Sequence, residues 1–138
     1  MTLFDTDVLV EILIGNSRFV KRASESPHDQ QGVTIVTVEE VLRGRLLAIR
    51  QAEAGKGPII VARAYELLEL SVNDFQRLTV VSYTDGADRR FQDFRRRIRV
   101  STHDLCIAAI CMDHSATLVS RNRRDFEQIP GLSVEFWE

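Results

Sequence analysis

The chain has 138 residues, of which 44% are hydrophobic and 28% charged, and its 18 basic and 20 acidic side chains give a formal net charge of −2. This composition is typical of a globular domain and excludes a disordered, collagenous or coiled-coil chain. The near-neutral balance also removes the simplest argument for a nucleic-acid partner, which is a strongly basic chain. Lys21 and Lys56 are the only lysines, however, which leaves 16 arginines, and arginine binds phosphate in a planar, bidentate geometry.

Strands and helices are predicted to alternate along the chain. The first half is predicted to contain a strand at Thr2–Asp5, helices at Asp7–Ile14 and Ser17–Ser26, a strand at Val33–Val36, a helix from Thr37 to about Glu53, and a helix from Pro58 to about Leu70. The second half is predicted to contain strands at Leu78–Ser82, Thr117–Ser120 and Val134–Phe136 and helices at Asp85–Arg97 and Asp104–Met112. This alternation predicts one domain over residues 1–138, a three-layer α/β/α fold with a central parallel sheet.

The sequence gives three indications of cellular location. The first ten residues contain two aspartates and no basic residue, which is unlike a secretory signal. The longest apolar runs are far shorter than the roughly 20 residues that span a bilayer. Cys106 and Cys111 lie five positions apart in one predicted helix, a poor spacing for a disulfide, and are expected to be free thiols of a reducing compartment. We therefore expect a cytoplasmic protein without a membrane segment.

Acidic and amide side chains follow the predicted strands where the strands end or the next helices begin. They are Asp5, Asp7, Glu40, Asp104, Asn122 and Asp125. Because the carboxyl ends of parallel strands meet at one edge of a sheet, these side chains are expected to converge there. Carboxylates gathered in this way repel one another unless a cation neutralises them, and Mg²⁺ and Mn²⁺ prefer oxygen ligands. The pattern suggests metal-dependent hydrolysis of a phosphodiester.

Helix capping is the competing explanation for each acid taken alone. Asp and Asn are preferred N-caps, and the helix dipole stabilises negative charge at a helix N-terminus. Thr37 and Glu40 have the spacing of a capping box, which favours a capping role for Glu40 considered by itself. For Asp104 alone, the sequence leaves a cap and a site equally open. The whole set of acids favours a site.

Four blocks of sequence follow one another in a fixed order. They are Leu3–Glu11 (LFDTDVLVE), Thr34–Gly44 (TIVTVEEVLRG), His103–Ala109 (HDLCIAA) and Thr117–Phe126 (TLVSRNRRDF), the last followed by Pro130–Leu132. In order and spacing these blocks resemble the PIN-domain ribonucleases, particularly the VapC-type toxins of bacterial toxin–antitoxin pairs. The resemblance extends over essentially the whole chain.

The resemblance implies a PIN fold and an endoribonuclease that depends on Mg²⁺ or Mn²⁺. It further implies an RNA substrate, a cognate antitoxin protein and a homodimer. Asp5, Glu40 and Asp104 would be the metal-binding acids. In the second block of the family a glutamate stands four residues before a glycine, which selects Glu40 rather than Glu39.

The chain departs from the family pattern at three positions near this site. Asn122 matches the fourth acidic position by register, and Asp125, one helical turn later, could supply the missing charge. Asp7 stands where asparagine is more usual and adds an acid to the edge. Ser120 stands where threonine is commoner and is expected to orient a ligand or a water by a hydrogen bond.

Nine of the arginines lie in two short segments. Arg121, Arg123 and Arg124 belong to the fourth block, and Arg121 and Arg123 are expected to contact the RNA backbone. Six more lie between Arg89 and Arg99, where a solvated helix face and a phosphate-binding edge are equally open.

Two other functions remain in competition. Asp5-Thr6-Asp7 imitates the opening of haloacid-dehalogenase-like phosphatases, in which Asp5 would be the nucleophile and Asp7 the acid/base. That chemistry needs a lysine near the phosphate, and neither lysine of this chain follows a predicted strand. A non-catalytic module that binds RNA or a partner on the same fold is the second alternative, because Asn122 carries no charge.

Overall fold

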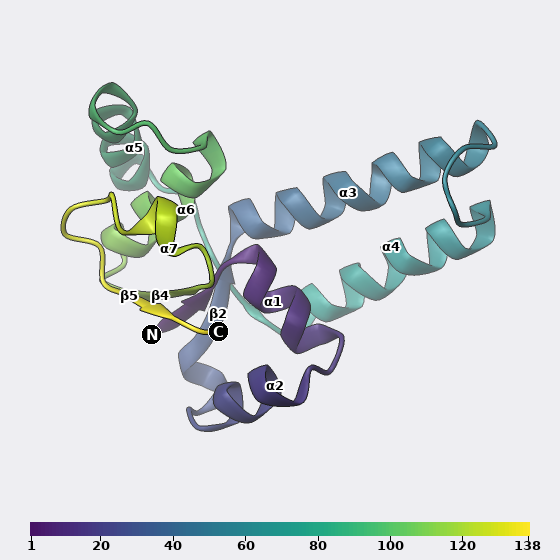
Figure 1. The fold of residues 1–138 in the computed structure, drawn as a ribbon, viewed down its shortest axis with the longest axis horizontal. Coiled ribbons are helices and arrows are strands. Elements are labelled where there is room, and N and C mark those ends of the chain that lie inside the picture. The colour runs from purple at the N-terminus through teal and green to yellow at the C-terminus, as the bar shows by residue number, and fades with distance from the viewer.

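A parallel five-stranded sheet forms the centre of the structure, a computed structural model that describes residues 1–138 (Figure 1). Its strands are β1 (Thr2–Phe4), β2 (Gln31–Thr34), β3 (Thr79–Val81), β4 (Thr117–Ser120) and β5 (Val134–Phe136), in the order β3-β2-β1-β4-β5. All neighbouring strands are parallel, so their carboxyl ends share one edge. The chain moves outward from β1 first through β2 and β3 and later through β4 and β5. Open sheets bind ligands at such a change of direction.

Helices connect the strands and cover the sheet. They are α1 (Thr6–Leu13), α2 (Ser17–Ser24), α3 (Ile35–Glu53), α4 (Val61–Gln76), α5 (Asp85–Arg97), α6 (Thr102–Asp113) and the short α7 (Arg123–Phe126), with one 3₁₀ turn, η1 (His28–Gln30), before β2. Neither η1 nor α7 is among the elements predicted from the sequence. Figure 1 shows α5, α6 and α7 on one side of the sheet and α1 and α2 on the other.

Each face of the sheet buries its own hydrophobic cluster. Side chains alternate along a strand, so Leu3 faces one cluster and the adjacent Phe4 faces the other. The first cluster packs α5 and α6 against the sheet through residues such as Phe91 and Ile110. The second packs α1 and α2 against the sheet around Phe19. The predicted three-layer α/β/α fold with a central parallel sheet is thereby confirmed.

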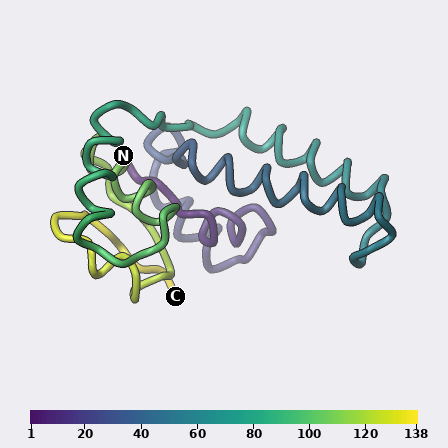
Figure 2. The backbone as a smooth tube through the Cα atoms, turned by 90° about the horizontal axis from the view of Figure 1, so that it is seen from above, coloured from purple at the N-terminus to yellow at the C-terminus, as the bar shows by residue number.

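Helices α3 and α4 form a long antiparallel hairpin that extends away from the sheet (Figures 1 and 2). Gly55 and Gly57 in its turn have φ of +70° and +83°, a left-handed conformation that glycine adopts without steric cost. The hairpin exposes many large apolar side chains, among them Leu46, Leu47, Val61, Tyr65, Leu70 and Val72. No helix of the structure combines the length and the apolar character needed to cross a bilayer.

Several predicted boundaries are wrong, and those of β2 and α4 have clear physical reasons. Strand β2 ends at Thr34 rather than Val36, because the Thr34 hydroxyl caps a helix that begins at the next residue. Helix α4 begins at Val61 rather than Pro58, because the turn of the hairpin continues beyond the proline. It also runs to Gln76 rather than Leu70, since its last turn packs Phe75 against the second cluster. Tertiary packing overrides local propensity in the last case.

Candidate functional site

Asp5 lies at the junction of β1 and α1, at the middle of the sheet's carboxyl edge. Its Oδ1 accepts a hydrogen bond from the backbone N–H of Val8 at 2.9 Å, which makes it the N-cap of α1. Its Oδ2 accepts a hydrogen bond from the Ser120 hydroxyl. Only 5% of Asp5 is exposed. Asp5 is therefore a helix cap and a buried acid at the same time, and the two interpretations do not exclude one another.

Ser120 and Asn122 link the acids from the end of β4. The buried Ser120 hydroxyl accepts a hydrogen bond from the Asn122 backbone N–H at 2.9 Å and donates to Asp5. The side-chain Nδ2 of Asn122 donates to Oδ2 of Asp104 at 3.3 Å and to Oδ2 of Asp125 at 2.9 Å. A continuous set of hydrogen bonds thus runs from Asp5 through Ser120 and Asn122 to the other two acids.

Asp104 lies in the first turn of α6 but does not begin that helix. The sequence predicted a start at Asp104, whereas α6 begins at Thr102. Its N-cap is Ser101, whose hydroxyl accepts the Asp104 backbone N–H at 3.3 Å. The capping alternative for Asp104 is therefore wrong, since Ser101 already holds that role. The carboxylate of Asp104 remains available to the sheet edge, near the positive end of the α6 dipole.

Glu40 lies in the second turn of α3. The N-cap of α3 is Thr34, whose hydroxyl accepts the Thr37 backbone N–H at 3.2 Å, so the predicted capping box of Thr37 and Glu40 is wrong. The physical reason is that an earlier threonine satisfies the free N–H groups of the helix. Glu40 instead accepts a hydrogen bond from the Thr6 hydroxyl of α1 at 3.3 Å. This contact carries the glutamate toward Asp5.

A small cavity of about 70 Å³ gathers these side chains at the sheet edge. Its lining residues are Asp5, Thr6, Asp7, Glu40, Asp104, Ile107 and Asn122. The predicted convergence of the acids is therefore found. Of the two candidates for the fourth position, Asn122 lines the cavity and Asp125 lies behind it, hydrogen-bonded to the Asn122 amide. Ser120 also lies behind the lining and contacts Asp5.

Burial and mutual repulsion raise the pKa of two of these acids. Desolvation is the largest cause for Asp5 and raises its pKa to about 6, although hydrogen bonds from Ser120 and Val8 oppose the rise. Asp7 and Glu40 add repulsion. Desolvation also raises the pKa of Asp104, and a hydrogen bond with Asp125 adds to the rise. The cavity thus brings together carboxyl groups whose ionised form is disfavoured by burial and by their neighbours.

The donor set of the cavity fits a hard divalent cation in its chemistry. Every polar lining side chain offers carboxylate, amide or hydroxyl oxygen, and none offers sulfur or imidazole. As the side chains stand, no three His, Cys, Asp or Glu residues are arranged closely enough to hold an ion. A bound cation would therefore draw the carboxylates closer together and offset their mutual repulsion.

The arginines of the fourth block already have partners. Arg121 lies 3.2 Å from Glu11 and stacks over the ring of Phe19 at 5.4 Å. Arg123 lies 3.0 Å from Glu127 and stacks over the ring of Phe136 at 4.4 Å. Sequence position alone did not reveal these contacts.

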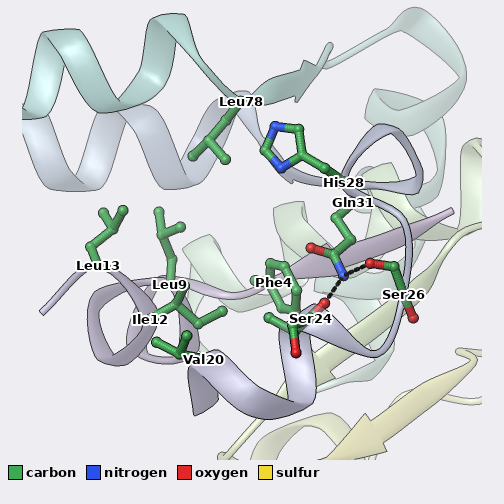
Figure 3. Close-up of a pocket in the computed structure, with 11 residues that line it drawn as sticks. Phe4, Leu9, Ile12, Leu13, Val20, Ser24, Ser26, His28, Gln31 and Leu78 are labelled. Carbon is green, nitrogen blue, oxygen red and sulfur yellow. Dashed lines mark hydrogen bonds between the residues drawn. The ribbon is translucent and has the colours of Figure 1, made fainter. Parts of the chain in front are cut away.

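An apolar pocket of about 260 Å³ lies apart from the acids, between α1 and α2 and beside the start of β2 (Figure 3). Figure 3 shows Leu9, Leu13 and Leu78 directed into it, with His28 and Gln31 at its side. Gln31 donates hydrogen bonds to the backbone carbonyls of Ala23 and Ser26, which tie α2 and the following loop to β2. This pocket has no titratable cluster and lacks the chemistry of the acidic cavity.

Sequence reasoning missed two lining residues of the cavity. Thr6 contacts Glu40, and Ile107 supplies an apolar wall. The position of Thr6 between two aspartates was a usable signal. Nothing in the local sequence distinguishes Ile107 from the other apolar residues of α6.

Comparison with known proteins places the chain in a family context. The model of the PIN domain family matches residues 2–132. Ribonuclease VapC1 of Rickettsia felis is 42% identical over 41 residues, which are 30% of this chain and 31% of that protein. The match thus spans about a third of the length of this curated relative.

Solved structures share the fold over nearly the whole chain. VapBC2 from Rickettsia felis, bound to a DNA fragment from the promoter, superposes with a TM-score of 0.75 at 16% identity, covering 99% of this chain and 98% of that one. FitAcB from Neisseria gonorrhoeae gives a TM-score of 0.76 at 19% identity, covering 97% and 96%. VapBC-5 from Mycobacterium tuberculosis is more distant, with a TM-score of 0.53 at 28% identity over 78% and 81%.

Proposed function

The chain belongs to the PIN domain family, and on that premise we propose that it is a metal-dependent endoribonuclease of the VapC toxin type. The observation that carries the proposal is the single cavity in which Asp5, Glu40, Asp104 and Asn122 meet from four separate elements. The relative named ribonuclease VapC1 supports the same reaction class.

Asp5, Glu40 and Asp104 would hold Mg²⁺ or Mn²⁺, and Asn122 would add a neutral oxygen. A bound cation of this kind supplies an activated water and stabilises the charge that develops on the phosphate. Ser120 orients the Asp5 carboxylate, and Thr6 orients Glu40. Asp125 fixes the Asn122 amide, because its carboxylate accepts the amide N–H and its backbone N–H donates to the amide oxygen. Asp7 contributes further negative charge at the rim.

The same proposal includes a cognate antitoxin, a homodimer and a cytoplasmic location. Solved neighbours of this fold include a toxin–antitoxin complex from Klebsiella pneumoniae, with a TM-score of 0.71 at 21% identity. The exposed apolar side chains of the α3–α4 hairpin and the apolar pocket of Figure 3 are surfaces that protein partners can cover.

The phosphatase alternative has less support. Lys21 lies on α2 and Lys56 in the turn of the α3–α4 hairpin, and neither lines the acidic cavity. That chemistry would also leave Glu40 and Asp104 without a role. The non-catalytic module is the outcome to be tested against, because Asn122 reduces the charge available to a cation.

Cleavage of structured RNAs by purified, antitoxin-free protein tests the proposal. We expect cleavage with Mg²⁺ or Mn²⁺ that EDTA abolishes and that Asp5→Asn and Asp104→Asn reduce by at least about 100-fold, as loss of a metal ligand in a catalytic site does. Asp29→Asn, in η1 and outside the cavity, is the matched control and should cleave normally. Cleavage that survives in both site variants would contradict the assignment of these acids. RNA binding without cleavage by the wild type would establish the non-catalytic module.

A further inference from the structure

The arginines of α5 lie on its outer surface. Ala87, Phe91 and Phe94 bury the inner face of the helix in the first hydrophobic cluster. The five arginines of α5 lie outside this buried face, among acidic and polar residues, and all five are exposed. Because the apolar face of α5 is buried against the sheet, its charged face is exposed to solvent.

The C-terminal arginines of α5 lie at the same end of the molecule as the acidic cavity. Helices α5 and α6 pack against each other, and Thr84 at the start of α5 donates a hydrogen bond to Asp113 at the end of α6. The two helices are thus antiparallel, and residues 98–101 join the end of α5 to the start of α6 (Figure 1). That connection limits the distance between Arg97 and Thr102 to roughly 17 Å. Asp104 of the cavity lies two residues further on.

Most of these C-terminal arginines have no acidic partner. Arg97 pairs with Asp93, but Arg95, Arg96 and Arg99 form no ion pair. The segment 94–103 contains four arginines and no acid. Arg90 differs, because it lines a separate pocket with Met112 and Thr117 at the opposite end of α6. Three unpaired arginines therefore lie on the segment that leads into the first turn of α6, where Asp104 lines the cavity.

We propose that Arg95, Arg96 and Arg99 form a phosphate-binding edge that holds the sugar–phosphate backbone of the RNA beside the acidic cavity. This inference rests on the proposed ribonuclease function and names the surface that receives its substrate. An acidic cavity repels a polyanion, so substrate binding requires positive charge close to it. Arg121 and Arg123 are less suitable, because each would first have to leave a carboxylate, whereas Arg95 contacts only the Phe91 ring and the Gln92 amide. The contact is to phosphate and carries no sequence preference of its own.

RNA binding without divalent ions separates this surface from the chemistry of the cavity. Fluorescence anisotropy measures the affinity of the full chain in EDTA for a labelled single-stranded RNA over a series of KCl concentrations. The test variant is R95Q/R96Q/R99Q. The matched control is R18Q/R50Q/R77Q, which removes the same amount of charge. These three arginines are also exposed and without an ion pair, and they lie on α2, at the far end of α3 and after α4. Thermal melts check that both variants fold.

The test variant should bind RNA about 10- to 100-fold more weakly than the wild type at about 0.1 M salt. The slope of log affinity against log salt concentration should become shallower by about 2, because each of the three lost phosphate contacts contributes about 0.7 to that slope. The control should stay within about threefold of the wild type. Equal losses in both variants, no loss in either, or no RNA binding by the wild type would overturn the proposal.

Cleavage assays distinguish the two proposals: RNA cleavage with an unchanged KM in the test variant rejects the arginine edge alone. Failure of the wild type to cleave, with binding lost only in the test variant, rejects the ribonuclease alone.

Discussion

The Ser120 hydroxyl donates a hydrogen bond to the buried Asp5 carboxylate across 115 residues of sequence. The same hydroxyl accepts the backbone N–H of Asn122, so it fixes both an acid of the cavity and the amide beside it. The bond joins the end of β1 to the end of β4. These are the neighbouring strands from which the chain builds the sheet outward in opposite directions. One buried serine thus couples the central strand pair to the geometry of the candidate site.

Removal of this hydroxyl should weaken both the fold and the site. Ser120→Ala leaves Asp5 with one protein donor and is expected to destabilise the protein by about 1–3 kcal/mol in a urea titration. It should also lower Mg²⁺ affinity, because the Asp5 pKa rises further when the donor is lost. Ser133→Ala, which removes an exposed hydroxyl bonded to Thr117, is the control and should cost less than about 0.5 kcal/mol. Equal effects of the two substitutions would contradict the role of Ser120.

The stability of the metal-free protein should depend on Asp5 ionisation. Burial raises the Asp5 pKa from 3.8 to about 6, so the folded state holds this proton more tightly than the unfolded state. The contribution of Asp5 to stability is therefore complete below about pH 4 and is lost as the pH rises through 6. Melting temperatures of the wild type and Asp5→Asn, measured in EDTA, should coincide near pH 4, and the variant should become the more stable protein by pH 7. A variant that is less stable than the wild type at pH 7 would refute this account.

Divalent cations should reverse that pH dependence. A cation binds the ionised carboxylates of the folded state, so Mg²⁺ should raise the melting temperature at pH 7.5 and much less at pH 5, where Asp5 is largely protonated. Calorimetric scans with Mg²⁺ and with EDTA measure the difference. Asp104→Asn should lose most of the increase. An equal increase at both pH values would place the bound ion elsewhere.

Asp104 and Asp125 should differ in their effect on catalysis. Asp104 lines the cavity, whereas Asp125 acts on it through the Asn122 amide. We expect Asp104→Asn to lower kcat by at least about 100-fold and Asp125→Asn by about 10-fold, the usual cost of losing a residue that only orients a metal ligand. Single-turnover cleavage assays at saturating Mg²⁺ compare the two. A larger loss for Asp125→Asn would make Asp125 the ligand and Asn122 its support.

Two glycines with different surroundings give opposite predictions for stability. A Cβ at Gly32 of β2 would stand 2.5 Å from the backbone carbonyl oxygen of Thr79 in β3, whereas a Cβ at Gly44 of α3 meets nothing within 4 Å. Gly32→Ala should destabilise the protein by about 1–3 kcal/mol, because the paired strand must shift. Gly44→Ala should stabilise it by about 0.5–1 kcal/mol through helix propensity. Urea titrations of both variants measure these changes, and stabilisation by Gly32→Ala would contradict the close packing of β2 and β3.

Much of the fold and of the candidate site follows from the sequence alone. The alternation of strands and helices predicts the three-layer fold, because hydrophobic period and turn residues act over a few positions. The acids at the strand ends predict the edge at which a cavity forms, because parallel strands end together. The predicted bounds of α5, β4 and β5 agree with the structure for the same reason.

Only the tertiary structure decided which of several adequate local partners each group uses. Thr34 and Ser101, rather than Thr37 and Asp104, cap their helices. Asn122 lines the cavity while Asp125 supports it, and Arg121 and Arg123 pair with carboxylates while Arg95 and Arg96 of α5 do not. Such choices depend on contacts between residues far apart in the chain, such as Ser120 and Asp5, and on the burial that those contacts create. The net charge of −2 therefore hides a local segregation, because the acids line one cavity while Arg95, Arg96 and Arg99 lie on the segment that leads to Asp104.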